Sequence, residues 1–103
     1  MIGPNFSQPT YNLSSIKMAL SDVNSLRITG SSRKGALELG FEDQDIVDAI
    51  QSIKTTDFYK TMPSQKIPGS ANHDVYKFSF KGIGIYAKFQ NLNGFIVVSF
   101  KAI

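Results

Sequence analysis

Residues 74–101, DVYKFSFKGIGIYAKFQNLNGFIVVSFK, decide the fold of this chain. Within them, three segments have the alternating or continuous apolar pattern of β-strands: residues 74–81, 83–90 and 95–101. The sequence Asn-Leu-Asn-Gly at 91–94 predicts a hairpin turn, because Asn and Gly tolerate the positive φ angles that such turns need. Lys81-Gly82 marks the other reversal. We therefore expect three antiparallel strands in series, the last of them central or covered because it is apolar on both sides.

The chain before these strands has helical periodicity. Asn12 is the predicted cap of a first helix, since apolar residues recur at helical spacing over residues 12–26. One of the two serines at 31–32 is the predicted cap of a second, short helix that Gly40 ends. Residues 43–53 predict a third helix, with acidic residues at its start, where the helix dipole favours them.

Shorter features complete the predicted fold. Residues 26–29 are a candidate short strand, residues 57–62 predict a turn leading into another short strand, and residues 63–72 predict a surface loop. A length of 103 residues suits one domain over residues 1–103 and is too short for two. Helices first and strands last predict an α+β domain, in which N-terminal helices pack on a C-terminal antiparallel sheet.

The composition excludes several classes of protein. Cysteine is absent, so the chain has no disulfide, no thiol nucleophile and no cysteine metal site. No signal-peptide pattern opens the chain, and its longest apolar run, residues 95–98, is far shorter than the roughly 20 residues of a membrane helix. We therefore expect a soluble cytoplasmic protein that does not contact the membrane.

Positive charge is concentrated in the C-terminal half. Residues 1–53 have four basic and six acidic side chains, whereas residues 54–103 have seven lysines and two aspartates. A cationic surface suits a polyanionic partner such as RNA. Lysines on the wet face of a sheet also serve solubility and protect its edges, so charge alone leaves both interpretations open.

Strand alternation sorts the side chains of the sheet into two faces. The apolar set, with Tyr76, Phe78 and Phe80 in one strand and Ile85 and Phe89 in the next, is expected beneath the helices. The opposite face is expected to hold a polar set: His73, Lys77, Lys81, Tyr86, Lys88 and Gln90.

A basic face with a histidine and a tyrosine suits metal-free RNA cleavage. RNA carries its own nucleophile, the 2′-OH, so the protein needs only a base, a proton donor and a cation beside the phosphorane. No paired-acid motif indicates metal-dependent cutting, and a single histidine argues against a zinc site.

Each of these side chains also has an ordinary explanation. His73 as a loop histidine would simply be solvated, Tyr86 would pack on the sheet, and Lys60, Lys77 and Lys88 would face solvent. Their combination on one face indicates a surface that binds RNA or cuts it.

Three blocks of the sequence resemble the MqsR toxin family, a group of mRNA interferases in the RelE-like superfamily. They are the segments DFYKTM at 57–62, HDVY at 73–76 and VVSFK at 97–101, with IYAK at 85–88 between the last two. Their order and spacing fit from Leu39-Gly40 to the C-terminus, and the N-terminal third fits more loosely. The resemblance implies a RelE/MqsR-like fold and a ribosome-independent and metal-independent endoribonuclease that cleaves single-stranded mRNA at short GC-starting sequences.

The resemblance also implies roles for particular residues and partners. The family's catalytic Lys, Gln and Tyr fall at Lys60, His73 and Tyr86. The side chains that we expect to bind RNA around them are Lys77, Lys81, Lys88 and Gln90. The implied partners are mRNA and a cognate antitoxin, a small DNA-binding protein through which the toxin contacts DNA only indirectly. No cofactor and no metal ion are expected.

The middle catalytic position departs from the family. Its best-known members have Gln where this chain has His73. His, with an ordinary pKa of about 6.5, transfers protons near neutrality and Gln does not. His73 is therefore either a general base or acid, or a hydrogen-bonding group for the phosphate as Gln would be. A rival class is a catalytically degenerate module that keeps the fold and binds RNA or the antitoxin in operon regulation.

Overall fold

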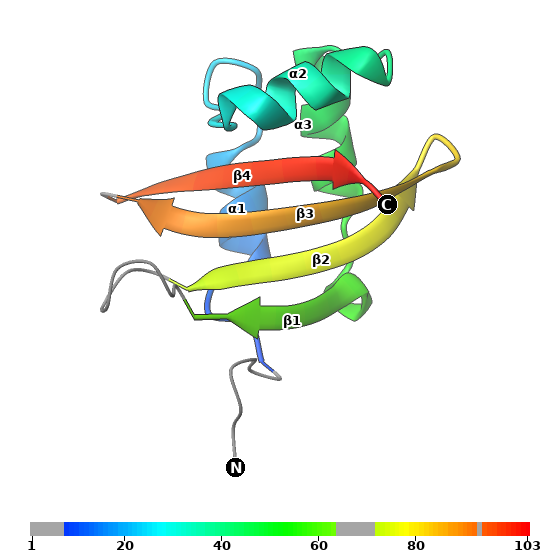
Figure 1. Ribbon diagram of the computed structural model, residues 1–103. Helices are drawn as coiled ribbons and strands as arrows, with labels where there is room; N and C mark the ends of the chain where they lie inside the picture. The colour runs from blue at the N-terminus through cyan, green and yellow to red at the C-terminus, as the bar shows by residue number, and fades with distance from the viewer. Residues whose placement is uncertain (1–7, 64–71, 93) are drawn as a thin grey trace.

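The computed structural model describes residues 8–63, 72–92 and 94–103 (Figure 1). The helices of this part of the chain are α1 (Leu13–Ala19), α2 (Gly30–Glu38) and α3 (Asp43–Ser52), followed by the 3-10 turn η1 (Thr55–Asp57). The strands are β1 (Phe58–Met62), β2 (His73–Phe80), β3 (Ile83–Leu92) and β4 (Phe95–Ala102). They form one antiparallel sheet in the order β1-β2-β3-β4. The predicted α+β architecture is therefore confirmed.

Helix α1 begins as predicted and ends early. Asn12 Oδ1 accepts a hydrogen bond from Ser15 N (3.1 Å) and so caps the helix. The periodicity predicted continuation toward residue 26, but Asp22 accepts hydrogen bonds from Asn24 N (2.7 Å) and Ser25 N (3.1 Å). This side chain offers the backbone a local alternative to the helix, and the chain turns there instead.

The caps of α2 and α3 come from the residues just before each helix. Thr29, and not one of the serines at 31–32, is the N-cap of α2, and its side chain accepts from Ser32 N (3.3 Å). Gly40, with φ 83°, follows the end of α2 as predicted. At the start of α3, Glu42 N donates to the Asp45 carboxylate (2.9 Å).

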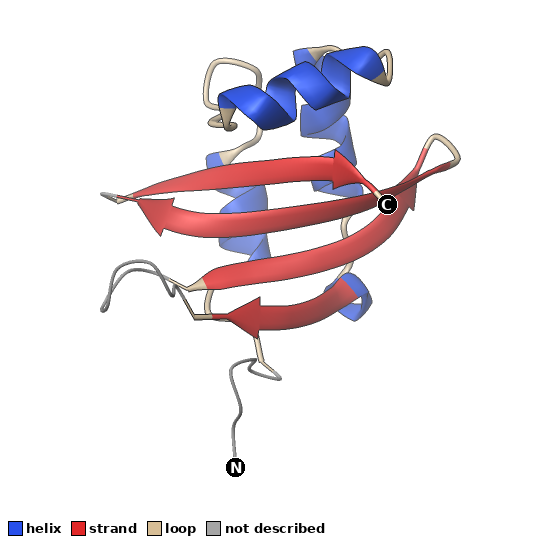
Figure 2. Cartoon of the chain, in the orientation of Figure 1, coloured by secondary structure: helices blue, strands red, loops and turns tan. Residues whose placement is uncertain are grey.

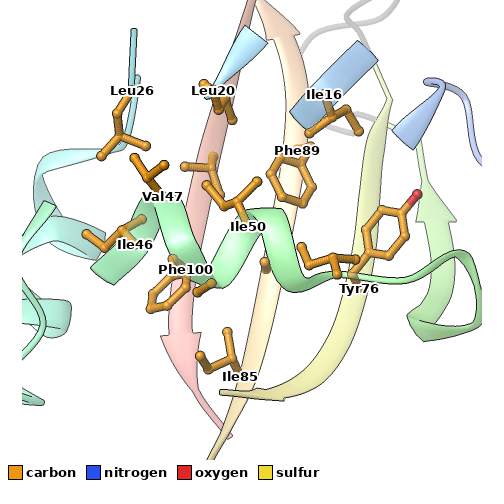
Figure 3. Packing of buried hydrophobic residues seen from close by; sticks show 14 of the residues in the cluster. Ile16, Leu20, Leu26, Ile46, Val47, Ile50, Tyr76, Ile85, Phe89 and Phe100 are labelled. Carbon is orange, nitrogen blue, oxygen red and sulfur yellow. The ribbon is translucent and has the colours of Figure 1, made fainter. Parts of the chain in front are cut away.

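The core lies between the helices and one face of the sheet (Figures 2 and 3). Ile46 and Ile50 of α3 and Ile16 of α1 belong to the same buried cluster as Tyr76 and Phe89 of the sheet. The predicted apolar face is thus the helix-facing one. Within the described ranges, no helix is both long and apolar enough to cross a membrane.

Strand β4 is an edge strand whose outer edge is covered. Val98 N donates to Arg27 O (2.9 Å), and Val98 O accepts from Thr29 N (3.2 Å). The predicted strand at 26–29 is reduced to this parallel bridge between Ile28 and Val98. Phe100 N donates to Ser32 Oγ (3.0 Å), so a side chain of α2 also satisfies a backbone donor at this edge. β4 is covered, although it is not central.

Both predicted reversals are at the expected places. Lys81 (φ 52°) and Gly82 (φ 77°) form the β2–β3 turn, and both have the positive φ that a two-residue hairpin turn of type I′ needs. At the β3–β4 turn, Gly94 has φ 86° and its N–H donates to Asn91 Oδ1 (3.0 Å). Asn93 and most of the predicted loop, residues 64–71, lie outside the described residues.

Candidate functional site

The face of the sheet that points away from the core, called here the open face, brings together most of the predicted site residues. Its central row crosses all four strands: Lys60 pairs with Val75, Val75 with Lys88, and Lys88 with Ser99. Directly opposed residues of an antiparallel pair project to the same side. Val75 is fully buried even though it lies on this face, so its small side chain forms a floor between two lysines.

The other predicted residues lie in the rows on either side of the central row. In one neighbouring row, Lys77 pairs with Tyr86 and Tyr86 pairs with Lys101. In the other, His73 pairs with Gln90, so that both lie at the opposite side of Val75 from Tyr86. The structure therefore places Lys60, His73 and Tyr86 on one face, around one floor residue.

A β-bulge in β1 adds a tyrosine to this face. The register advances from Phe58, opposite Tyr76, to Lys60, opposite Val75, so two steps in β1 match one step in β2. The extra residue, Tyr59, contacts Lys77, whose Nζ lies 3.8 Å from the centre of its ring. Tyr59 and Lys60 are therefore consecutive residues that both contribute to the open face.

The surroundings of His73 favour its neutral form. Partial burial lowers the pKa of His73 below its ordinary value, and the positive charge of Lys88 lowers the pKa further. A hydrogen bond with the Gln90 side chain acts in the opposite direction and is the smaller cause. The imidazole is therefore able to accept a proton at neutral pH.

Tyr86 lies between two cations. Lys101 Nζ is 5.1 Å from the centre of its ring, and Lys77 Nζ is 5.9 Å away from the same point. Tyr76 of the neighbouring strand provides a contrast, because it is buried on the helix side. Burial raises the pKa of Tyr76 to about 12, and the charge of Asp74 raises it as well. Of these two tyrosines, only Tyr86 is on the face with the lysines.

Lys81 is not on the open face, contrary to the prediction from strand alternation. Its Nζ lies 2.7 Å from Asp45 Oδ1, and Asp45 belongs to α3 on the helix side. The cause is the left-handed backbone of the turn, which removes Lys81 from the two-residue alternation of the strand. We therefore exclude Lys81 from the candidate site.

A cavity of about 260 Å³ borders the open face beside the start of α2. Tyr86, Lys88 and Lys101 line it from the sheet. Hydroxyl residues line it from the helix: Thr29, Ser31 and Ser32. Since Tyr86 and Lys88 belong to both features, the cavity extends the predicted site toward α2.

A buried carboxylate fixes the strands that carry Lys60 and His73. Asp74 has no exposed surface and accepts hydrogen bonds from Thr61 Oγ1 (2.6 Å), Thr10 N (2.9 Å) and Tyr11 N (2.8 Å). Thr61 follows Lys60 in β1, and Asp74 follows His73 in β2. Asp74 thus ties β1, β2 and the N-terminal segment together directly behind the site.

Three contributors to the site were not predicted from the sequence. Lys101 was predictable, because it alternates with Ser99 on the same strand. Tyr59 depends on a bulge that no alternation pattern indicates. The hydroxyl wall of α2 depends on tertiary packing. Within the described residues, no group of three or more His, Cys, Asp or Glu side chains is arranged as a metal site.

The comparison with protein families agrees with the sequence blocks. The model of a family described as "Motility quorum-sensing regulator, toxin of MqsA" matches residues 8–102. A comparison with curated proteins finds no match. The family match covers nearly the whole chain, including every strand of the sheet. The chain therefore belongs to the MqsR toxin family.

Proposed function

We propose that this chain, by its family a toxin of a toxin–antitoxin system, is an mRNA interferase. It cleaves single-stranded mRNA at short GC-starting sequences, and it needs neither the ribosome nor a metal ion. The proposal rests on one observation above all: Lys60 and Lys88 flank the buried Val75 in one row, with His73 on one side of that row and Tyr86 on the other.

This arrangement offers what an attack by the ribose itself requires. Neutral His73 takes the proton of the 2′-OH as the oxygen bonds to phosphorus. The ammonium groups of Lys60 and Lys88 stabilise the negative charge that develops on the phosphorane oxygens.

Departure of the 5′-oxygen completes the reaction. Tyr86 donates a proton to that oxygen as its bond to phosphorus breaks, and the two products are a 2′,3′-cyclic phosphate and a 5′-OH end. Lys77 and Lys88 also hold the flanking phosphates, and Lys101 joins them beside Tyr86. All charged groups assigned to RNA are cations, which suits a polyanion.

The family also supplies the regulatory partner. Its description names the toxin as that of MqsA, so a cognate antitoxin of this kind is the expected inhibitor. We propose that this antitoxin is a small DNA-binding protein and that the toxin reaches operator DNA only within that complex.

The test is cleavage of a defined single-stranded RNA by the purified chain, in buffer with and without EDTA. We expect cuts at GC-starting sequences, equal rates in both buffers, and fragments that end in a 2′,3′-cyclic phosphate and begin with a 5′-OH. Lys60→Met serves as the inactive control, because it keeps the length of the side chain and removes its charge.

Two outcomes would contradict the proposal in different ways. Loss of activity in EDTA would mean that a metal ion takes part. Intact RNA under all conditions, together with retained binding of RNA or antitoxin, would identify the chain as a degenerate toxin-fold module.

A further inference from the structure

We propose that Tyr59 is a base-stacking site that binds a nucleobase of the single-stranded RNA beside the reaction centre. The inference rests on the proposed function, because it requires RNA to cross the open face. In this proposal Tyr59 contributes to the affinity for RNA and to its orientation, whereas Lys60, His73 and Tyr86 act on the scissile phosphate.

The bulge leaves the ring of Tyr59 accessible on the open face. Half of the Tyr59 surface is exposed, whereas Tyr76 is buried in the core. Tyr11 is engaged through its hydroxyl, which donates to Asn72 O (2.8 Å) and accepts from Asn91 N (3.2 Å). Tyr59 is thus a half-exposed aromatic ring held on the rim of the cationic face.

Two lysine ammonium groups lie close to the ring of Tyr59. Lys77 Nζ lies 3.8 Å from the ring centre and Lys60 Nζ lies 5.3 Å from it. A cation over one face of an aromatic ring is an attractive arrangement. Because Tyr59 is half-exposed, ring surface is still accessible to a second planar group.

The combination of groups matches how proteins hold single strands. Aromatic side chains stack on bases while neighbouring lysines contact the phosphates that follow. Here Lys60 and Lys77 both touch the ring, and the strand positions of the open face hold no carboxylate among the described residues. A base on Tyr59 therefore places its own phosphate among ammonium groups next to Val75.

The experiment measures RNA binding separately from cleavage. The probe is a single-stranded oligonucleotide with a short GC-starting sequence, 2′-O-methyl riboses throughout, which block the attack, and 2-aminopurine as a fluorescent base. The test variant is Tyr59→Leu, which removes the ring and keeps apolar volume. Tyr59→Phe keeps the ring, and Lys77→Met removes a charge instead.

The matched control is Phe95→Leu. Phe95 is also half-exposed, and its ring also contacts a cation, because the Arg27 guanidinium lies 4.1 Å from the ring centre. It pairs with Leu92 at the β3–β4 turn, which is the opposite corner of the sheet from Tyr59. Thermal unfolding of each variant establishes that the fold is kept.

Base stacking is worth about 1–3 kcal/mol per base, so Tyr59→Leu should weaken binding about 5- to 150-fold and abolish the quenching of 2-aminopurine. Tyr59→Phe should retain most of the affinity. Tyr59→Leu should leave the salt dependence unchanged, because no phosphate contact is lost. Lys77→Met should reduce the slope of log K against log salt by about 0.7.

Two kinds of failure are distinguishable. In the first, the wild-type chain binds and cleaves RNA, but Tyr59→Leu binds the probe with unchanged affinity and quenching, or loses no more affinity than Phe95→Leu does. The stacking site is then wrong and the proposed function stands. If the wild-type chain binds no RNA, both proposals are wrong.

Discussion

At the scale of single residues, His73 is the position at which this chain departs from the MqsR pattern. The groups around His73 also determine its protonation state. Burial and Lys88 lower the pKa of His73, so the neutral imidazole dominates at neutral pH. The Gln of the best-known family members can hold a phosphate but cannot accept a proton. A neutral imidazole can accept the proton of a 2′-OH, which supports the proposed general-base role.

The first prediction concerns the loss of this imidazole. One general acid–base group contributes about 10²- to 10⁴-fold to a rate, so His73→Ala should reduce cleavage by about that factor. His73→Gln is the matched control, because it restores hydrogen bonding without proton transfer, and it should stay nearly as slow. Single-turnover cleavage of a short RNA measures both. A loss of only a fewfold in His73→Ala would remove His73 from the chemistry.

The second prediction concerns pH. Because the neutral form of His73 is the active one and its pKa is lowered, kcat/KM should rise with pH through a midpoint below about 6.5 and stay high at neutrality. The His73→Gln variant should lack this acidic limb. A limb with a midpoint above 6.5, or the same limb in the variant, would contradict the assignment.

At the scale of elements, two devices set the strand register that assembles the open face. The Lys81-Gly82 turn fixes how β2 and β3 pair, and a slip of one residue would move every side chain of a strand to the other face. The Asp74 carboxylate fixes β1 and the N-terminal segment against β2. The site therefore depends on a backbone conformation at one end of β2 and on a buried charge at its other end.

The third prediction compares two glycine substitutions that meet no steric contact. Gly82 has φ 77°, so Gly82→Ala should destabilise the fold by about 1–2 kcal/mol through backbone strain alone. Gly35 lies inside α2, where Gly35→Ala should stabilise by about 0.5–1 kcal/mol. Urea unfolding measures both changes in the free energy of unfolding. Changes of the same sign would contradict the assigned backbone conformations.

The fourth prediction concerns Asp74. Asp74→Ala removes the acceptor of Thr10 N and Tyr11 N, which are only partly buried, and one of the two acceptors of Thr61 Oγ1, whose other acceptor is Gln8 O (3.1 Å), so a loss of about 1–3 kcal/mol is expected. Asp48 is exposed on α3 and accepts a hydrogen bond from Gln44 (2.9 Å), and Asp48→Ala should change stability by less than about 0.5 kcal/mol. Equal urea midpoints for the two variants would show that the Asp74 contacts do not hold the strands.

At the scale of the whole molecule, the helices cover one face of the sheet and leave the lysine-rich face open (Figure 1). Acidic residues of α3 and its neighbours lie on the helix side, where Arg33 pairs with Asp43 (2.9 Å) and Lys81 pairs with Asp45. Lys60, Lys77, Lys88 and Lys101 lie on the open face. The molecule is therefore polarised more strongly than its net charge of +3 indicates.

The fifth prediction tests this polarity with two single lysine substitutions. Lys88→Ala should reduce the slope of log K against log salt for single-stranded RNA by about 0.7, because one phosphate contact is lost. Lys81→Ala removes the same charge on the helix side and should leave the slope unchanged. Fluorescence anisotropy titrations at several salt concentrations measure both. Equal effects would mean that binding follows total charge and not this face.

Much of this architecture was predictable from the local sequence. Asn12 as a cap, Gly40 after α2, the Lys81-Gly82 turn and the alternation of β2 and β3 depend on interactions between residues near one another in the chain. The same alternation predicted His73, Lys77, Tyr86, Lys88 and Gln90 on one face, where the structure has them. The catalytic and RNA-binding roles of these residues stay predictions.

The sequence by itself determined the order of helices and strands, the two faces of the central hairpin and the membership of the MqsR family, because these depend on hydrophobic periodicity, turn chemistry and residue identity. Only the tertiary structure decided three other features: Tyr59 on the open face, Lys81 on the helix side, and α2 beside Tyr86. The physical reason is that the bulge in β1, the pairing of Lys81 with Asp45 of α3 and the packing of α2 against the edge of β4 all involve partners distant in the sequence, which local periodicity does not indicate.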